Sequence, residues 1–130
     1  EDGAEQDDSA ATAIFISLGV EHQRNICGWG DADWFKFWTG GHDRYMFFAR
    51  SIGAGAAVRV SVYASDGTTL LGSATAPAVN SNTSLGEIVP KNQTIYVKAE
   101  PAFTNLTGTA VLYGMKVSPS YGFFMPIILK

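Results

Sequence analysis

The sequence predicts an all-β protein folded as an antiparallel sandwich or barrel. Runs in which apolar and polar residues alternate with a period of two recur along the chain, as expected for half-buried strands. Turn sequences rich in glycine, asparagine and aspartate separate these runs at short intervals. No apolar stripe with the 3.6-residue period of an amphipathic helix is long enough to compete with this interpretation.

The strand pattern is clearest in three segments. Val58–Tyr63 alternates strictly, and Thr94–Glu100 repeats the pattern with its apolar residues on one face. The segment 109–117 places Val111, Tyr113, Met115 and Val117 on one face as well. Two further runs are rich in aromatic residues, which favour pleated surfaces. Strands are predicted near residues 12–18, 22–27, 33–39, 44–50, 57–64, 69–74, 84–89, 94–100 and 109–117.

Turn chemistry separates the predicted strands. Gly40–Asp43 divides the two aromatic runs, and Ser65–Thr68 contains the Asp-Gly pair typical of tight hairpins. The polar stretch Asn80–Ser84 and the pair Pro90–Lys91 are predicted loops. Many short strands joined by such turns are typical of sandwiches and barrels.

Size and composition exclude several classes of protein. The 130 residues suit one domain, and with 46% hydrophobic and 16% charged residues the chain can form a packed core. A net charge of −3 argues against a nucleic-acid binder, which needs a basic surface to displace phosphate counterions. No apolar run reaches the roughly 18–20 residues of a membrane-spanning helix.

The two ends of the chain differ from its alternating body. The polar, acidic leader Glu1–Asp8 suits the mature start of a secreted protein, and the segment Ala11–Val20 that follows is apolar and β-branched. Phe123–Lys130 is apolar on both faces, and its Pro126 cannot donate a ladder hydrogen bond. We predict a leader at 1–10, a sandwich at 11–120 and a tail at 121–130. An end segment either packs into a neighbouring subunit or folds back on its own sandwich.

Four segments carry a resemblance to a known family. Gly30–Phe37 resembles the Gly-Asp-x-Asp-Trp-Phe-x-Phe signature of bacterial pre-peptidase C-terminal domains. Val60–Thr68 is similar to that family's strand-and-turn segment, and Thr94–Ala99 to its tyrosine-valine strand. Gly108–Tyr113 is similar to its closing Gly-Thr-Tyr-x-Leu strand, with Ala110 where tyrosine is usual. The resemblance implies a jelly-roll-like sandwich of a secreted protein, usually appended to a protease or another enzyme.

The resemblance also implies a calcium site. In similar collagen-binding modules of secreted collagenases, calcium ties an acidic leader to the sandwich. Asp31 and Asp33 match the acidic pair before the aromatic strand, and Asp7 and Asp8 would be the contribution of the leader. Calcium takes six to eight oxygen ligands, which four carboxylates and some carbonyls would supply. The alternative is that Asp31 and Asp33 cap a turn and that the leader is solvated.

The sequence contains no convincing active site. The two histidines, His22 and His42, lack an accompanying nucleophile motif, and a zinc site needs three or four closely placed cysteine or histidine ligands. The single cysteine, Cys27, is interpreted as a small buried hydrophobe, with an intermolecular disulfide as the alternative. We therefore expect a protein that is not an enzyme.

Aromatic residues offer the best candidates for ligand binding. A row of exposed rings would make a platform on which sugars stack, and Trp29, Trp38 and Tyr45 are the candidates. Trp29 lies between two glycines, which favours exposure, whereas Trp34 and the phenylalanines are expected in the core.

Three Asn-x-Ser/Thr sequons begin at Asn82, Asn92 and Asn105. All three fall in predicted loops or at strand edges, where a host with the machinery would attach glycans.

Two functions remain, both extracellular. The first, which the spare apolar end segments favour, is a structural subunit of a cell-surface or filamentous (pilus-like) assembly, a homopolymer joined by strand addition between copies. The second is an accessory module of a secreted enzyme that recognises protein or polysaccharide. A fold hosts many roles, so the fold class alone does not choose between them.

Overall fold

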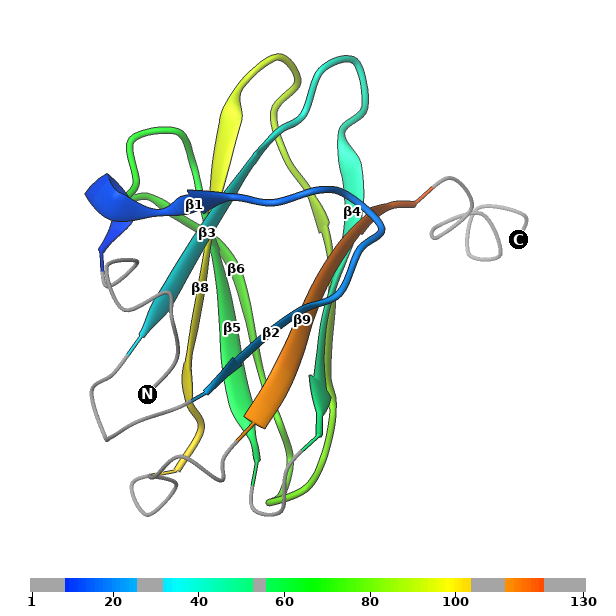
Figure 1. The fold of residues 1–130 in the computed structure, drawn as a ribbon. Coiled ribbons are helices and arrows are strands. Elements are labelled where there is room, and N and C mark those ends of the chain that lie inside the picture. Colours follow the sequence, from blue (N-terminus) through cyan, green and yellow to red (C-terminus); the bar gives the residue numbers. More distant parts are fainter. Residues whose placement is uncertain (1–8, 26–31, 53–55, 104–111, 121–130) are drawn as a thin grey trace.

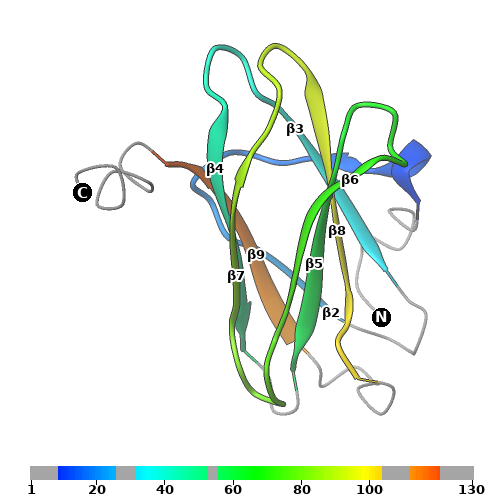
Figure 2. The ribbon, with the colours of Figure 1, turned by 180° about the vertical axis from the view of Figure 1, so that it is seen from behind.

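The computed structural model describes residues 9–25, 32–52, 56–103 and 112–120, and these form a β-sandwich. Figures 1 and 2 show its two layers from opposite sides. The elements are a 3₁₀ turn η1 (Ala10–Thr12) and the strands β1 (Ile14–Phe15), β2 (His22–Asn25), β3 (Asp33–Trp38), β4 (Arg44–Ser51), β5 (Val58–Tyr63), β6 (Leu70–Thr75), β7 (Thr83–Ile88), β8 (Thr94–Pro101) and β9 (Leu112–Pro119).

The strands are divided between a five-stranded and a four-stranded sheet. The five-stranded sheet has the order β1-β3-β8-β5-β6, and the four-stranded sheet has the order β2-β9-β4-β7. Every pair except β1–β3 is antiparallel. The chain passes repeatedly between the sheets, so that β3 and β8 lie in one layer while β4 and β9 lie in the other (Figure 1). This order is that of a jelly roll, which confirms the predicted fold class.

The core lies between the sheets and follows the predicted alternation. On β3 and β8 the side chains of Phe35, Phe37, Ile95 and Val97 are fully buried. The other inward-facing residues with at most 2% of their surface exposed include Tyr45, Phe47, Val58, Val60, Val62, Tyr113, Met115 and Val117. Val111, which was predicted to join them, lies outside the described residues.

The segment at the start of the domain differs most from its prediction. In place of a strand over 12–18, the chain forms η1 and then pairs only Ile14 and Phe15 with β3, in parallel. It then leaves the five-stranded sheet, and the backbone N–H of Gly19 donates to the Val117 carbonyl of the other sheet at 2.8 Å. Gly19 has a φ of +78°, which glycine adopts without strain. This crossing ends the strand early, and it places Ala11–Val20 against its own sandwich.

The predicted Asp-Gly hairpin joins β5 and β6. The carboxylate of Asp66 accepts hydrogen bonds from the backbone N–H groups of Thr68 and Thr69 and from the Thr69 hydroxyl. These bonds favour the charged form and lower the pKa of Asp66 to about 2. Gly67 supplies the left-handed φ of +73° that the turn requires.

Candidate functional site

The outer face of the five-stranded sheet carries several aromatic side chains. Successive side chains of a strand point to opposite faces, so the burial of Phe35 and Phe37 directs Trp34, Lys36 and Trp38 outward from β3. The same alternation directs Tyr96 outward from β8. On β5 it directs Tyr63 outward, because Val60 and Val62 are buried.

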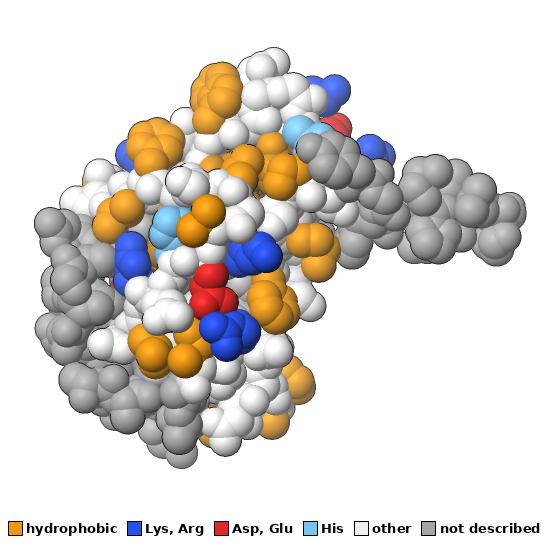
Figure 3. All heavy atoms as spheres, turned by 45° about the vertical axis from the view of Figure 1, so that its right-hand side comes forward, with side chains coloured by type: hydrophobic (Ala, Val, Ile, Leu, Met, Phe, Trp, Pro, Cys, Tyr) orange, Lys and Arg blue, Asp and Glu red, His pale blue; other side chains and the backbone are white. Residues whose placement is uncertain are grey.

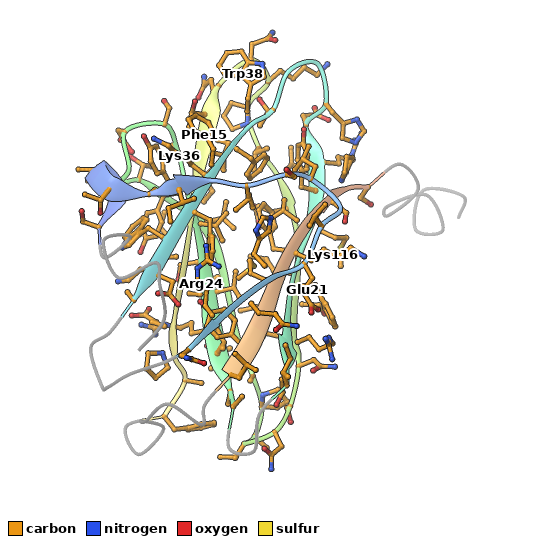
Figure 4. The ribbon with its side chains drawn as sticks, in the orientation of Figure 1. Phe15, Glu21, Arg24, Lys36, Trp38 and Lys116 are labelled. Carbon is orange, nitrogen blue, oxygen red and sulfur yellow. The ribbon has the colours of Figure 1, made fainter. Side chains whose placement is uncertain are left out.

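Strand register aligns these outward residues into one row across the sheet. Phe15 of β1 lies beside Lys36, Lys36 lies opposite Tyr96, Tyr96 opposite Tyr63, and Tyr63 opposite Leu70 of β6. We call these five residues the aromatic row. Its two ends are well exposed, with 62% of the Phe15 surface and 55% of the Leu70 surface accessible. Figure 4 shows Phe15 and Lys36 side by side where β1 meets β3.

Two tryptophans flank the aromatic row along β3. Trp38, at the end of the strand, has 55% of its surface exposed, and in Figure 4 it stands beyond Lys36 toward the β3–β4 turn. Trp34 is 9% exposed, with its ring centroid 5.2 Å from that of Tyr63. The prediction that Trp34 is buried is confirmed, but its side chain packs on the outer face of the sheet, not between the two sheets. η1, which contacts β3, lies at this side of the molecule.

Cations lie among these rings. The Lys36 ammonium lies 4.5 Å from the centroid of the Phe15 ring, and the Lys98 ammonium lies 5.7 Å from that of Trp34. Both distances are in the range of a cation–π attraction. Glu100, also on β8, pairs with Lys98 at 3.4 Å and with Arg59 of β5 at 2.9 Å. The face therefore combines flat apolar rings with hydrogen-bonding and charged groups.

The three aromatic residues predicted to bind ligand differ in where the structure places them. Trp38 is exposed beside the aromatic row, as a binding residue must be. Tyr45 is the wrong choice: it is 1% exposed in the core, and its hydroxyl donates to the Thr39 carbonyl at 2.9 Å. The register of β4 with β9 and β7 turns Tyr45 inward, since it shares a face with the buried Phe47. Trp29 lies outside the described residues.

Of the four predicted calcium ligands, the structure describes Asp33. It is 5% exposed, and its carboxylate accepts a hydrogen bond from the buried Tyr113 hydroxyl, across from β3 to β9. Arg24 lies beside Tyr113 in the register of β2 and β9, with its guanidinium 5.5 Å from the centroid of the Phe35 ring (Figure 4).

Tyr113, a residue of the opposite sheet, therefore takes up part of the acceptor capacity of the Asp33 carboxylate. Asp7, Asp8 and Asp31 lie outside the described residues. Within the described ranges no three histidine, cysteine or acidic side chains come together as metal ligands do. Calcium binding stays a prediction.

The remaining sequence candidates are dispersed. His42 contacts the Ser120 carbonyl through Nε2 at 3.1 Å and packs edge-on against Tyr45, whereas His22 lies on β2 opposite Met115. Across the part of the chain that the structure describes, no pocket opens on the surface, and no helix is long and apolar enough to span a membrane. Cys27 lies outside the described residues.

Two of the three sequons are described. Asn82 and Asn92 are exposed in the loops that precede β7 and β8, and Asn105 lies outside the described residues. The side chain of Asn82 accepts a hydrogen bond from the Ser51 backbone N–H at 2.9 Å. Glycosylation stays a prediction at all three positions.

The outer face of the four-stranded sheet carries an ion pair that the sequence did not reveal. Glu21 accepts two hydrogen bonds of 2.8 Å from the Arg50 guanidinium. The pair crosses β9 at Gly114, where a Cβ would collide with the Glu21 side chain. Hydrogen bonding from Arg50, with smaller effects of the hydrogen bond from Gln23 and the charge of Lys116, lowers the pKa of Glu21 to about 2. Figure 3 shows an acidic side chain between two basic ones on this face.

No protein-family model and no curated protein matches this chain. Its fold does match solved structures. The pre-peptidase C-terminal domain of a Bacillus anthracis collagenase superposes with a TM-score of 0.61 at 15% identity, over 82% of this chain and 94% of that one. CorA of Methylomicrobium album BG8, a surface-associated copper-binding protein, superposes with a TM-score of 0.65 at 7% identity, over 83% of this chain and 98% of that one. The resemblance noted in the sequence motifs is thus confirmed as one of fold: the chain has the β-sandwich of a pre-peptidase C-terminal domain.

Proposed function

We propose that this protein is a non-catalytic extracellular module that binds a polysaccharide on the outer face of its five-stranded sheet. The observation that carries the proposal is the aromatic row with Trp38 beside it, a set of flat rings on an open sheet. Exposed large apolar side chains are costly in water, and when they cluster they mark an interaction surface. Aromatic rings also offer apolar faces on which the C–H faces of sugar rings stack.

The shape of the surface favours a polymer over a small molecule. Small ligands are usually bound in concave pockets, and none opens among the described residues. The aromatic row instead crosses all five strands. With a strand spacing of about 4.8 Å, this corresponds to a platform roughly 19 Å long. Such a platform is long enough for several rings of an extended sugar chain.

The fold supports an extracellular role. A domain of a collagenase and a surface-associated protein share it. We infer that the module serves by attachment, holding an associated enzyme or surface to its target.

The test measures how much of the protein is retained on insoluble polysaccharides. It compares two variants, each of which lacks an exposed apolar side chain on one of the two sheets. Trp38→Ala removes a ring beside the aromatic row, while Ile88→Ala, at a position 53% exposed on β7, is the matched control on the other sheet. We expect Trp38→Ala to weaken binding about tenfold, which corresponds to about 1.4 kcal/mol of lost contact. Ile88→Ala should bind like the wild type. Failure of the wild type to bind any polysaccharide, or equal binding by both variants, would refute the proposal.

A second candidate function is a self-assembling structural subunit, favoured by the short strand pairing of the segment Ala11–Val20. Its pairing with β3 consists of Ile14 and Phe15 and continues with the bond from the Ile16 N–H to the Lys36 carbonyl. Phe15, Leu18 and Val20 in this segment are exposed. A short, apolar edge strand of this kind can make the same contacts on a neighbouring copy, which is the basis of strand exchange.

A further inference from the structure

The charges on the outer face of the five-stranded sheet differ from those of the whole chain. The protein has a net charge of −3. The outward-facing strand residues of this sheet include three cations, Lys36, Lys98 and Arg59, and one anion, Glu100. The described strand residues of this face therefore carry an excess of two positive charges, three minus one. The β5–β6 loop adds Asp66, whose carboxylate is already engaged by Thr68 and Thr69.

Lys36 is the most informative of these cations. Among the described residues it has no carboxylate partner, and its ammonium lies over the Phe15 ring at 4.5 Å. It stands within the aromatic row, between Phe15 and Tyr96. A lysine that lies between flat rings and has no carboxylate partner in the described part of the chain is placed to pair with a charge that arrives with a stacked ligand.

Lys98 supplies a second, partly neutralised cation. Glu100 is shared, since one of its oxygens lies 3.4 Å from Lys98 while the other accepts two hydrogen bonds from Arg59 at 2.9 and 3.0 Å. One carboxylate cannot neutralise two cations. Lys98 follows Tyr96 by two positions on β8, so it lies on the same face about 7 Å further along the strand.

We propose that the polymer bound on this face is an acidic polysaccharide, one that carries carboxylate or sulfate groups on its sugar rings. This inference rests on the proposed function and adds the ligand class. In such a polymer the apolar ring face stacks on Tyr96, Tyr63 or Trp38, while the acidic group at the ring edge meets the Lys36 ammonium. A neutral polysaccharide would satisfy the rings but leave Lys36 without a partner.

The test compares acidic with neutral polymers and one lysine with another. Polygalacturonate and alginate are the acidic probes, and cellulose and chitin are the neutral ones. Binding of the protein to each polymer is measured at 20 mM and 500 mM NaCl. These concentrations lie about fivefold below and above 0.1 M, at which the Debye length is about 10 Å. Lys36→Gln tests the face, and Lys116→Gln, on the other sheet (Figure 4), is the matched control because it removes the same charge.

We expect an acidic probe to bind in low salt and to lose about tenfold in affinity in high salt. Lys36→Gln should weaken binding to that probe about fivefold or more, a fold-change corresponding to about 1 kcal/mol, whereas Lys116→Gln should not. Salt-insensitive binding of cellulose or chitin that Trp38→Ala weakens would overturn this inference and leave the proposed function standing. Equal losses from Lys36→Gln and Lys116→Gln would also overturn it, since net charge alone would then explain binding. Retention of no polymer would end both proposals.

Discussion

Tyr113 and Tyr45 offer a matched test of how the core holds its polar groups. Both side chains are at most 1% exposed, and the hydroxyl group of each donates a hydrogen bond. The hydroxyl of Tyr113 donates to the carboxylate of Asp33, itself buried, and the hydroxyl of Tyr45 donates to the neutral carbonyl of Thr39. Replacement of each tyrosine by phenylalanine deletes the same oxygen and leaves a different acceptor.

The expected magnitudes follow from the two acceptors. A hydrogen bond to a charged group contributes about 1.5–3 kcal/mol to stability, whereas a neutral one contributes about 0.5–1.5 kcal/mol. Tyr113→Phe also leaves a carboxylate with 5% exposure short of a donor, which adds a desolvation cost. We therefore expect Tyr113→Phe to lower the free energy of unfolding by about twice as much as Tyr45→Phe.

Urea denaturation monitored by tryptophan fluorescence measures the free energy of unfolding that each variant loses relative to the wild type. The dependence of the free energy on urea should be unchanged in both variants, because neither alters the surface exposed on unfolding. A smaller loss for Tyr113→Phe than for Tyr45→Phe would refute the reasoning, since the buried carboxylate would then not depend on the tyrosine hydroxyl.

Four further predictions concern the core, the surface ion pair, the metal and the assembly. Phe37→Ala should cost about 3–5 kcal/mol in urea melts, because the ring is 1% exposed and its loss leaves a cavity; a cost below about 1 kcal/mol would contradict the strand register. The pKa of Glu21 lies at about 2 in the folded protein against an ordinary 4.5, so its pairing with Arg50 stabilises the fold above pH 4.5 and is lost as the pH falls toward 2. The stability difference between wild type and Arg50→Gln should therefore shrink over that window, and a difference independent of pH would count against the pairing. Calorimetric titration with calcium should give heat that Asp31→Asn abolishes, and no heat at millimolar calcium, or equal heat from the variant, ends that prediction. If strand exchange joins copies, deletion of residues 1–20 should abolish assembly in electron micrographs, and a truncated protein that still polymerises would show that the segment is not the donor.

Much of the fold was predictable because strand formation is encoded locally. The alternation over 58–63 and 94–100 assigned those strands and the buried face of each, since the pleat turns successive side chains to opposite sides. The run Tyr45–Ala49 could not be assigned in the same way, because it is apolar on both faces. Only its pairing with β9 and β7 decides that Tyr45 points into the core while Phe48 does not.

The candidate site illustrates the same division. Covalent geometry along a single strand places Trp34, Lys36 and Trp38 of β3 on one face. Trp34 was nevertheless expected in the core, and the tertiary structure decided that this face is the outer one. The tertiary structure alone decided that Phe15, Tyr96, Tyr63 and Leu70 line up with Lys36, since cross-strand register joins residues up to 60 positions apart, as in the pair Lys36–Tyr96. It also decided that Glu21 reaches Arg50 across Gly114. Such neighbours arise from packing between distant segments, which no local pattern of residues records.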